Sequence, residues 1–157
     1  MVKSRLAIPP DAFTLSSLSL DVQRLHAEHH PGIFKMPASE DFALPYFEAM
    51  LADPAVRIFI AEDEGKAVGC IVCKLMERPD NPFTYAARTL LVDQISVRPE
   101  ARGKGVGREL MNRAEMLGRA LNAARIDLNS WDFNLDAHAF FERMGYEKFN
   151  FRFWKHL

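Results

Sequence analysis

The sequence of 157 residues predicts one α/β (α+β) domain whose sheet contains both antiparallel and parallel strand pairs. Three observations carry this prediction. The length suits a single domain, and 48% hydrophobic with 26% charged residues is typical of a globular chain. Strand-like and helix-like segments follow one another in the order β-α-α-β-β-β-α-β-α-β, with no repeat and no linker. We therefore treat residues 1–157 as one domain.

The first third of the chain predicts a short strand and two helices. Residues 3–8 alternate polar and apolar side chains, as a strand does, and Pro9-Pro10 ends them. Asp11 is placed to cap a helix that runs to Pro31-Gly32. A second helix is predicted from Ser39 to Asp53-Pro54, and Pro45 inside it is expected to kink or interrupt it.

The middle of the chain predicts a hairpin, because residues 56–61 and 67–76 are strand-like and the turn 62–66 joins them. A loop over 78–82 leads to a third strand over 89–97. The clearest helix covers residues 106–121, where apolar side chains recur at steps of three and four. The remaining predicted elements are a strand over 125–131, a helix from Asn134 that stops at Gly145, and a last strand over 146–154.

The charge balance excludes several classes of function. Lys and Arg number 20 and Asp and Glu 21, so the chain has no broad basic face for nucleic acid. No apolar run approaches the ~20 residues that a membrane-spanning helix needs, and the first residues lack the apolar core of a signal peptide. We expect a cytoplasmic protein without nucleic-acid or membrane partners.

Cys70 and Cys73 form a C-x-x-C pattern, which is consistent with a redox pair or half of a metal site. The surrounding residues predict a strand, in which positions i and i+3 face opposite sides. We therefore favour two core residues over a site, and we predict no bound metal.

A glycine-rich loop, Arg102-Gly103-Lys104-Gly105-Val106-Gly107, precedes the clearest helix. Glycines allow a close approach of the backbone to a ligand, and the start of a helix offers unpaired N–H groups that bind phosphate. Residues 98–125 hold seven Lys/Arg against three Asp/Glu. The pattern of a nucleotide-triphosphate loop is absent, since no Lys-Ser or Lys-Thr follows. These residues leave two interpretations of the loop open: it binds a dinucleotide, with Asp127 as the ribose ligand, or it binds coenzyme A.

Two motifs in this order resemble the GNAT superfamily of acetyl-CoA-dependent N-acetyltransferases. Arg102, Gly105 and Gly107 fill the superfamily pattern [Q/R]-x-x-G-x-[G/A]. A second pattern, N-x-x-A-x-x-F-[YF]-x-x-x-G-[FY], is matched from Asn134 to Tyr146. The similarity extends from about Leu90 to the end of the chain.

The resemblance implies a mostly antiparallel sheet in which the strand ending at Val97 is bulged and splays from the strand over 125–131. The pantetheine arm of acetyl-CoA would lie in this gap and the pyrophosphate on the glycine loop. The residues that would contact the coenzyme are Ile95, Ser96, Val97, Arg102, Gly103, Lys104, Gly105, Val106, Gly107, Arg108, Asn134 and Phe141. Phe141 stands where many relatives have Tyr, and it cannot supply a proton to the leaving thiolate.

The implied reaction is direct transfer of an acetyl group to an amine in a ternary complex. A protonated amine is no nucleophile, so a base has to remove its proton, and Asp93 is the candidate. We expect a small-molecule amine, with an acyl-CoA sensor and a protein N-acetyltransferase as alternatives. His26, His29 and His30 lie on the expected acceptor side, and a shared metal at His26 and His30 is the less favoured interpretation. Residues 149–154 could pair across a homodimer.

Overall fold

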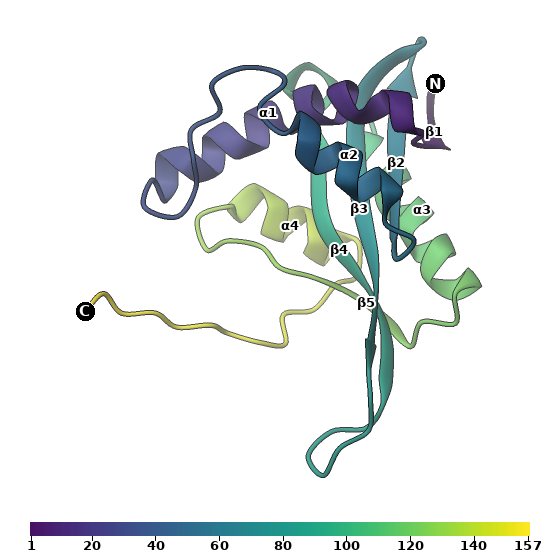
Figure 1. Cartoon of the computed structure of the whole chain (residues 1–157), viewed down its shortest axis with the longest axis vertical. Coiled ribbons are helices and arrows are strands. Elements are labelled where there is room, and N and C mark those ends of the chain that lie inside the picture. Colours follow the sequence, from purple (N-terminus) through teal and green to yellow (C-terminus); the bar gives the residue numbers. More distant parts are fainter.

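The computed structural model describes all residues, 1–157, and contains one five-stranded sheet in the order β1-β2-β3-β4-β5 (Figure 1). The first four strands pair antiparallel, and β5 joins β4 in parallel. The prediction of a mixed, mostly antiparallel sheet is therefore confirmed. The strands are β1 Val2–Leu6, β2 Val56–Asp63, β3 Lys66–Arg78, β4 Ala87–Val97 and β5 Arg125–Leu128.

Four helices cover the two faces of the sheet. Helices α1 (Ala12–His29) and α2 (Leu44–Ala52) pack with β2 and β3 in one apolar cluster. Helices α3 (Val106–Ala120) and α4 (Leu135–Arg143) pack against the other face in a second cluster. Short 3-10 turns, Pro9–Asp11 and Pro99–Ala101, precede α1 and the loop before α3. None of the helices has the combination of length and apolarity needed to cross a membrane.

The two cysteines of β3 point to opposite faces of the sheet. Cys70 belongs to the cluster under α1 and α2, and Cys73 to the cluster under α3 and α4. Both thiols are free and buried, and burial raises the pKa of each to about 12. The prediction of two core residues is confirmed, because thiols on opposite faces cannot share one ion or form a bond.

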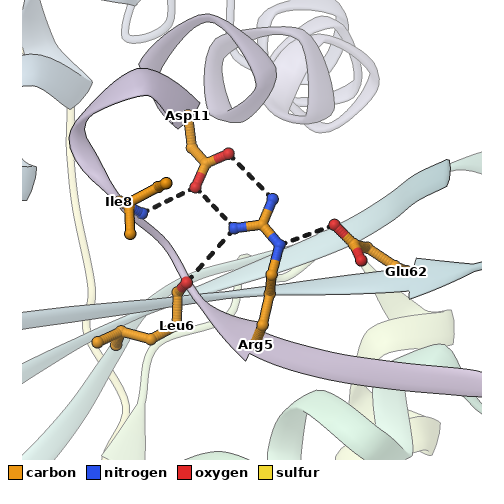
Figure 2. Close-up of polar contacts among 5 residues, drawn as sticks. All are labelled: Arg5, Leu6, Ile8, Asp11 and Glu62. Carbon is orange, nitrogen blue, oxygen red and sulfur yellow. Dashed lines mark hydrogen bonds and ion pairs between the residues drawn. The ribbon is translucent and has the colours of Figure 1, made fainter. Parts of the chain in front are cut away.

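The start of α1 is held by an ionic network rather than by a side-chain cap. Asp11 occupies the capping position, but its carboxylate accepts a hydrogen bond from the backbone N–H of Ile8, at 2.8 Å. The guanidinium of Arg5 binds both Asp11 oxygens at 2.8 and 3.0 Å, and its Nε donates to Glu62 at 2.8 Å (Figure 2). These contacts join β1, the start of α1 and β2. Hydrogen bonds from Arg5 lower the pKa of Asp11, with burial opposing the shift.

We expect Asp11→Asn to lower the free energy of unfolding by about 1–2 kcal/mol at pH 7, because charge-assisted hydrogen bonds are lost and Arg5 is partly exposed. The folded-state pKa of Asp11 is lowered, so its stabilisation is present above the unfolded value of about 3.9 and is lost as pH falls through the folded value. Urea unfolding from pH 7 to pH 2 should show the variant and wild type converging. Asp63→Asn, at an exposed pair with the N-terminal amine, is the control and should change little.

Three predicted elements differ from the structure. Helix α2 begins at Leu44, so Pro45 lies in its first turn, where proline is tolerated, and no kink arises. Ser39 does not cap it, because the capping position is Ala43. Strand β5 covers four residues rather than the predicted 125–131. The predicted last strand over 146–154 is not formed, since these residues have no strand partner.

Candidate active site

Strand β4 carries a bulge and then separates from β5. The register places Val72 opposite Gln94 and Cys73 opposite Val92, so Asp93 is the extra residue. Pairing with β5 stops at Val92 and Leu128. The edge of β4 from Asp93 to Val97 that faces away from β3 therefore has no strand partner. The bulge and the splay that the family resemblance implies are both present, and an extended ligand can form backbone hydrogen bonds in the gap.

The glycine loop presents unpaired N–H groups. Gly103 and Gly105 have φ of +75° and +84°, and a Cβ at either would meet no atom within 4 Å. The first backbone hydrogen bond of α3 runs from the N–H of Glu109 to the carbonyl of Gly105, at 3.0 Å. None of the six N–H groups of residues 103–108 has a hydrogen-bond acceptor in the chain. Such a nest at a helix start binds anions.

Three cations border this nest. Arg102, Lys104 and Arg108 are exposed and form no ion pair with an acidic side chain. Arg98 differs from them, because its guanidinium donates to Ser17 on α1 at 2.9 Å. Unpaired donors, an open backbone and free positive charge together fit a pyrophosphate.

Asp93 lies at the bulge, where β4 leaves β5. Its carboxylate is 3.4 Å from Nζ of Lys74 on β3, and its side chain is 31% exposed. Asp93 belongs to the part of β4 that has no β5 partner, and its one ionic contact is with β3, the neighbour on the other side. The structure thus places the candidate base where β4 loses its β5 partner and pairs it with a cation that the sequence did not suggest.

The next polar side chains of β4 face α1 instead. The hydroxyl of the buried Ser96 donates to the carbonyl of Leu18. The amide of Gln94 donates to the hydroxyl of Ser19. Only the backbone of Ser96 can contact a ligand in the gap, whereas its side chain fixes α1 to the sheet.

Helix α4 adds two of the sequence-predicted residues. Asn134 caps it by accepting a hydrogen bond from the N–H of Ala137 at 3.3 Å, which leaves the side-chain NH₂ free to donate. Phe141 is buried in the cluster under α3. The nearest phenol, Tyr146, donates its hydroxyl to Glu115 at 3.1 Å, so it does not replace the hydroxyl that Phe141 lacks.

Gly107 has a packing role that sequence reasoning missed. A Cβ there would lie 3.0 Å from the ring of Phe140, so the missing side chain lets α4 rest against the start of α3. Val106 also has two roles: its side chain is buried in the core, and its backbone N–H is one of the unpaired N–H groups of the glycine loop. The motif glycine therefore brings the Asn134 segment close to the glycine loop.

Comparison with known proteins decides the family. A model described as Acetyltransferase (GNAT) family matches residues 20–146. The chain belongs to this family. An aminoalkylphosphonate N-acetyltransferase of Salmonella typhimurium is 32% identical over 111 residues, covering 71% of this chain and 70% of that protein. The GNAT membership confirms the predicted reaction class, an acetyl-CoA-dependent N-acetyltransferase.

Solved structures confirm the GNAT fold. A mutant of the BH1408 protein from Bacillus halodurans superposes with a TM-score of 0.91, at 23% identity, with 99% of each chain covered. An aminoglycoside N-acetyltransferase, AAC(6')-Iy in complex with CoA, superposes with a TM-score of 0.75 at 16% identity, covering 100% of this chain and 95% of that one. At these identities the likeness concerns the fold alone.

This GNAT chain also has an aromatic and histidine cluster that the sequence indicated only in part. His29 stacks on Phe133 with ring centroids 4.1 Å apart, and His30 lies 5.2 Å from Trp131 and 5.5 Å from Trp154. Nε2 of His30 is 3.3 Å from Asp132. The cluster joins the end of α1 to the connection between β5 and α4. His26 bonds through Nδ1 to the carbonyl of Val22 at 2.6 Å. No three His, Cys, Asp or Glu side chains of the chain are grouped so that they could hold a metal ion.

Proposed function

We propose that this enzyme transfers the acetyl group of acetyl-CoA to the primary amine of a small molecule, by direct attack in a ternary complex. The observation that carries the proposal is the row of six unpaired N–H groups over 103–108, next to the open edge of β4. A pyrophosphate and an extended amide arm need these two features side by side. Acetyl-CoA supplies an activated thioester that the amine can attack.

The chain's own residues would hold and polarise the donor. N–H groups from Gly103 to Arg108 bind the pyrophosphate, and Arg102, Lys104 and Arg108 balance its charge. Backbone groups of Ile95 and Val97 bind the pantetheine arm, and the N–H of Ile95 donates to the thioester carbonyl, an interaction often worth about 3 kcal/mol in the transition state. The free NH₂ of Asn134 donates to the arm, and Phe141 packs beside the sulfur.

Asp93 would accept the proton of the attacking amine, directly or through one water molecule. Asp93 is the bulge residue, two positions before Ile95, whose N–H would bind the thioester carbonyl, and this closeness along the strand supports its assignment as the base. No side chain at the position of Phe141 can protonate the leaving thiolate. With a thiol pKa near ~8.5, departure without a general acid is feasible.

The acceptor is expected between the end of α1 and the connection from β5 to α4. The aromatic and histidine cluster lies there, and its rings offer apolar walls with polar edges. Residues 1–97 carry nine Lys/Arg against thirteen Asp/Glu, which favours a cationic amine. The relatives' names support small amines, since they concern an aminoalkylphosphonate and an aminoglycoside.

Thermal unfolding with acetyl-CoA, NAD or ATP tests the coenzyme first. A ligand at 100 times its Kd adds about 2.7 kcal/mol to the free energy of unfolding, and we expect this for acetyl-CoA alone. Thiol release is then measured with aminoalkylphosphonates, aminoglycosides, polyamines and peptides. Stabilisation by NAD instead would contradict the proposal. Binding without turnover of any amine would favour an acyl-CoA sensor, and turnover of peptides alone a protein acetyltransferase.

A further inference from the structure

The carboxylate of Asp93 has a single polar partner in the structure. The polar side chains that follow it on β4, Gln94 and Ser96, are held by hydrogen bonds to α1. No hydrogen bond from the chain reaches the Asp93 carboxylate, and its one ion pair is with Nζ of Lys74 on β3, at 3.4 Å. The orientation of the candidate base therefore depends on one ammonium group.

The bulge in β4 explains why Asp93 lacks other partners. In a regular ladder, side chains directly opposite each other on neighbouring strands hold one another in place. Val72 is opposite Gln94 and Cys73 is opposite Val92, so no β3 residue is opposite Asp93. Pairing with β5 has also ended at Val92. Asp93 thus has no directly opposed neighbour on either side.

Lys74 reaches the bulge from a neighbouring position of β3. Cys70 and Val72 pack in the cluster under α1 and α2, and side chains alternate along a strand, so Lys74 lies on this same face. Its own place in the ladder is opposite Leu91, beside the bulge. The long side chain extends diagonally to Asp93 and forms no other ion pair. Lys74 therefore supplies the neighbour that the bulge has removed.

We propose that Lys74 is a positioning residue for acetyl transfer. Its ammonium group holds the Asp93 carboxylate in the orientation from which the carboxylate accepts the proton of the attacking amine. The inference rests on the proposed role of Asp93 as the base. A partly exposed carboxylate without a partner is divided among several rotamers, and only some of these point at the amine. Lys74 itself needs no contact with coenzyme or amine, because it acts through Asp93.

A second ion pair on the same two strands provides a matched control. Arg88 of β4 pairs with Glu77 of β3 at 2.9 Å, and the two residues are directly opposite each other. They lie farther toward the tip of the β3–β4 hairpin, which projects from the sheet in Figure 1. Both pairs are partly exposed, and such pairs contribute little to the stability of a fold. Only the pair of Lys74 includes the candidate base.

Steady-state kinetics of Lys74→Met, with an amine that the enzyme acetylates, test the proposal. Methionine keeps an unbranched stem and removes the charge. We expect kcat to fall about tenfold, since a misplacement of about 1 Å can cost 100-fold. The KM for acetyl-CoA should be unchanged, because no proposed coenzyme contact involves β3. Lys74→Arg keeps a cation and should recover most of the lost rate. The control, Glu77→Gln, should keep kcat within about twofold of wild type, and the thermal unfolding of all three variants should be similar.

A double-mutant cycle with Asp93→Asn separates positioning from a general effect on the fold. Without the carboxylate there is no base to orient, so Lys74→Met should change kcat by less than about twofold in this background. Equal losses with and without the carboxylate would overturn the proposal, because Lys74 would then act by another route. An unchanged kcat for Lys74→Met, beside a low kcat for Asp93→Asn, would also overturn it and leave Asp93 as the base. If both single variants kept their kcat, the assignment of Asp93 as the base would fail together with this inference.

Discussion

Gly105→Asp is expected to reduce acetyl-CoA affinity by at least 100-fold. The position has φ of +84°, and a side chain built there enters the open space in front of the unpaired N–H groups. A carboxylate in that space would accept their hydrogen bonds and repel the pyrophosphate. Losing two charge-assisted hydrogen bonds of about 1.5–3 kcal/mol each corresponds to this change in Kd. Calorimetric titration measures it directly.

The matched control is Gly105→Asn, which has nearly the same shape and no charge. Both side chains meet the same backbone strain, and Asn adopts positive φ more readily than most residues. Thermal unfolding without ligand should therefore be similar for the two variants. The Gly105→Asn variant should keep much more of the wild-type affinity for acetyl-CoA than the Gly105→Asp variant does. Tight binding by Gly105→Asp would place the pyrophosphate elsewhere.

Asp93→Asn is expected to lower kcat by about 100-fold or more, which is the usual contribution of a general base. The KM for acetyl-CoA should stay the same, because the proposed coenzyme contacts are backbone groups and the glycine loop. Folding should be little affected, since the pair with Lys74 is partly exposed and such pairs contribute little to stability. Steady-state kinetics with a saturating amine give both quantities.

Asp127→Asn is the control for this experiment. Its carboxylate lies on β5, on the residue opposite Leu91, and pairs with Arg125 at 3.1 Å. We expect the kcat of the Asp127→Asn variant to stay within about twofold of wild type, because an exposed ion pair contributes little to the stability of the fold. If Asp93→Asn also keeps its kcat, water or the amine's own ionisation supplies the free amine, and Asp93 serves only to pair with Lys74.

The parts of the fold that depend on local pattern were predictable. β-Branched and aromatic residues with the turn between the two segments indicated β2 and β3, and the apolar stripe of α3 indicated the helix behind the glycine loop. The loop itself was recognisable because positive φ requires glycine at positions such as 103 and 105. Residues 146–154 have an equally clear strand pattern, yet they do not form a strand, because a strand also needs a neighbour that local sequence does not specify.

The contacts that depend on distant residues were not predictable. Arg5 meets Glu62 only after β1 pairs with β2. The approach of Phe140 to Gly107 requires α4 to be packed in place. Neither contact leaves a signal in one sequence, because the partners are far apart along the chain and arginine and glycine are common residues at surfaces and turns.

The opposite orientations of Cys70 and Cys73 have a practical consequence for experiments on this protein. A dye that counts the thiol of released coenzyme should not react with the folded chain, because both protein thiols are buried and hold their protons. When the fold opens, Cys70 becomes labelled as α1 and α2 lift, and Cys73 as α3 and α4 lift. One strand thus contains a separate chemical reporter for each helical layer, and single-cysteine variants would reveal which layer opens first.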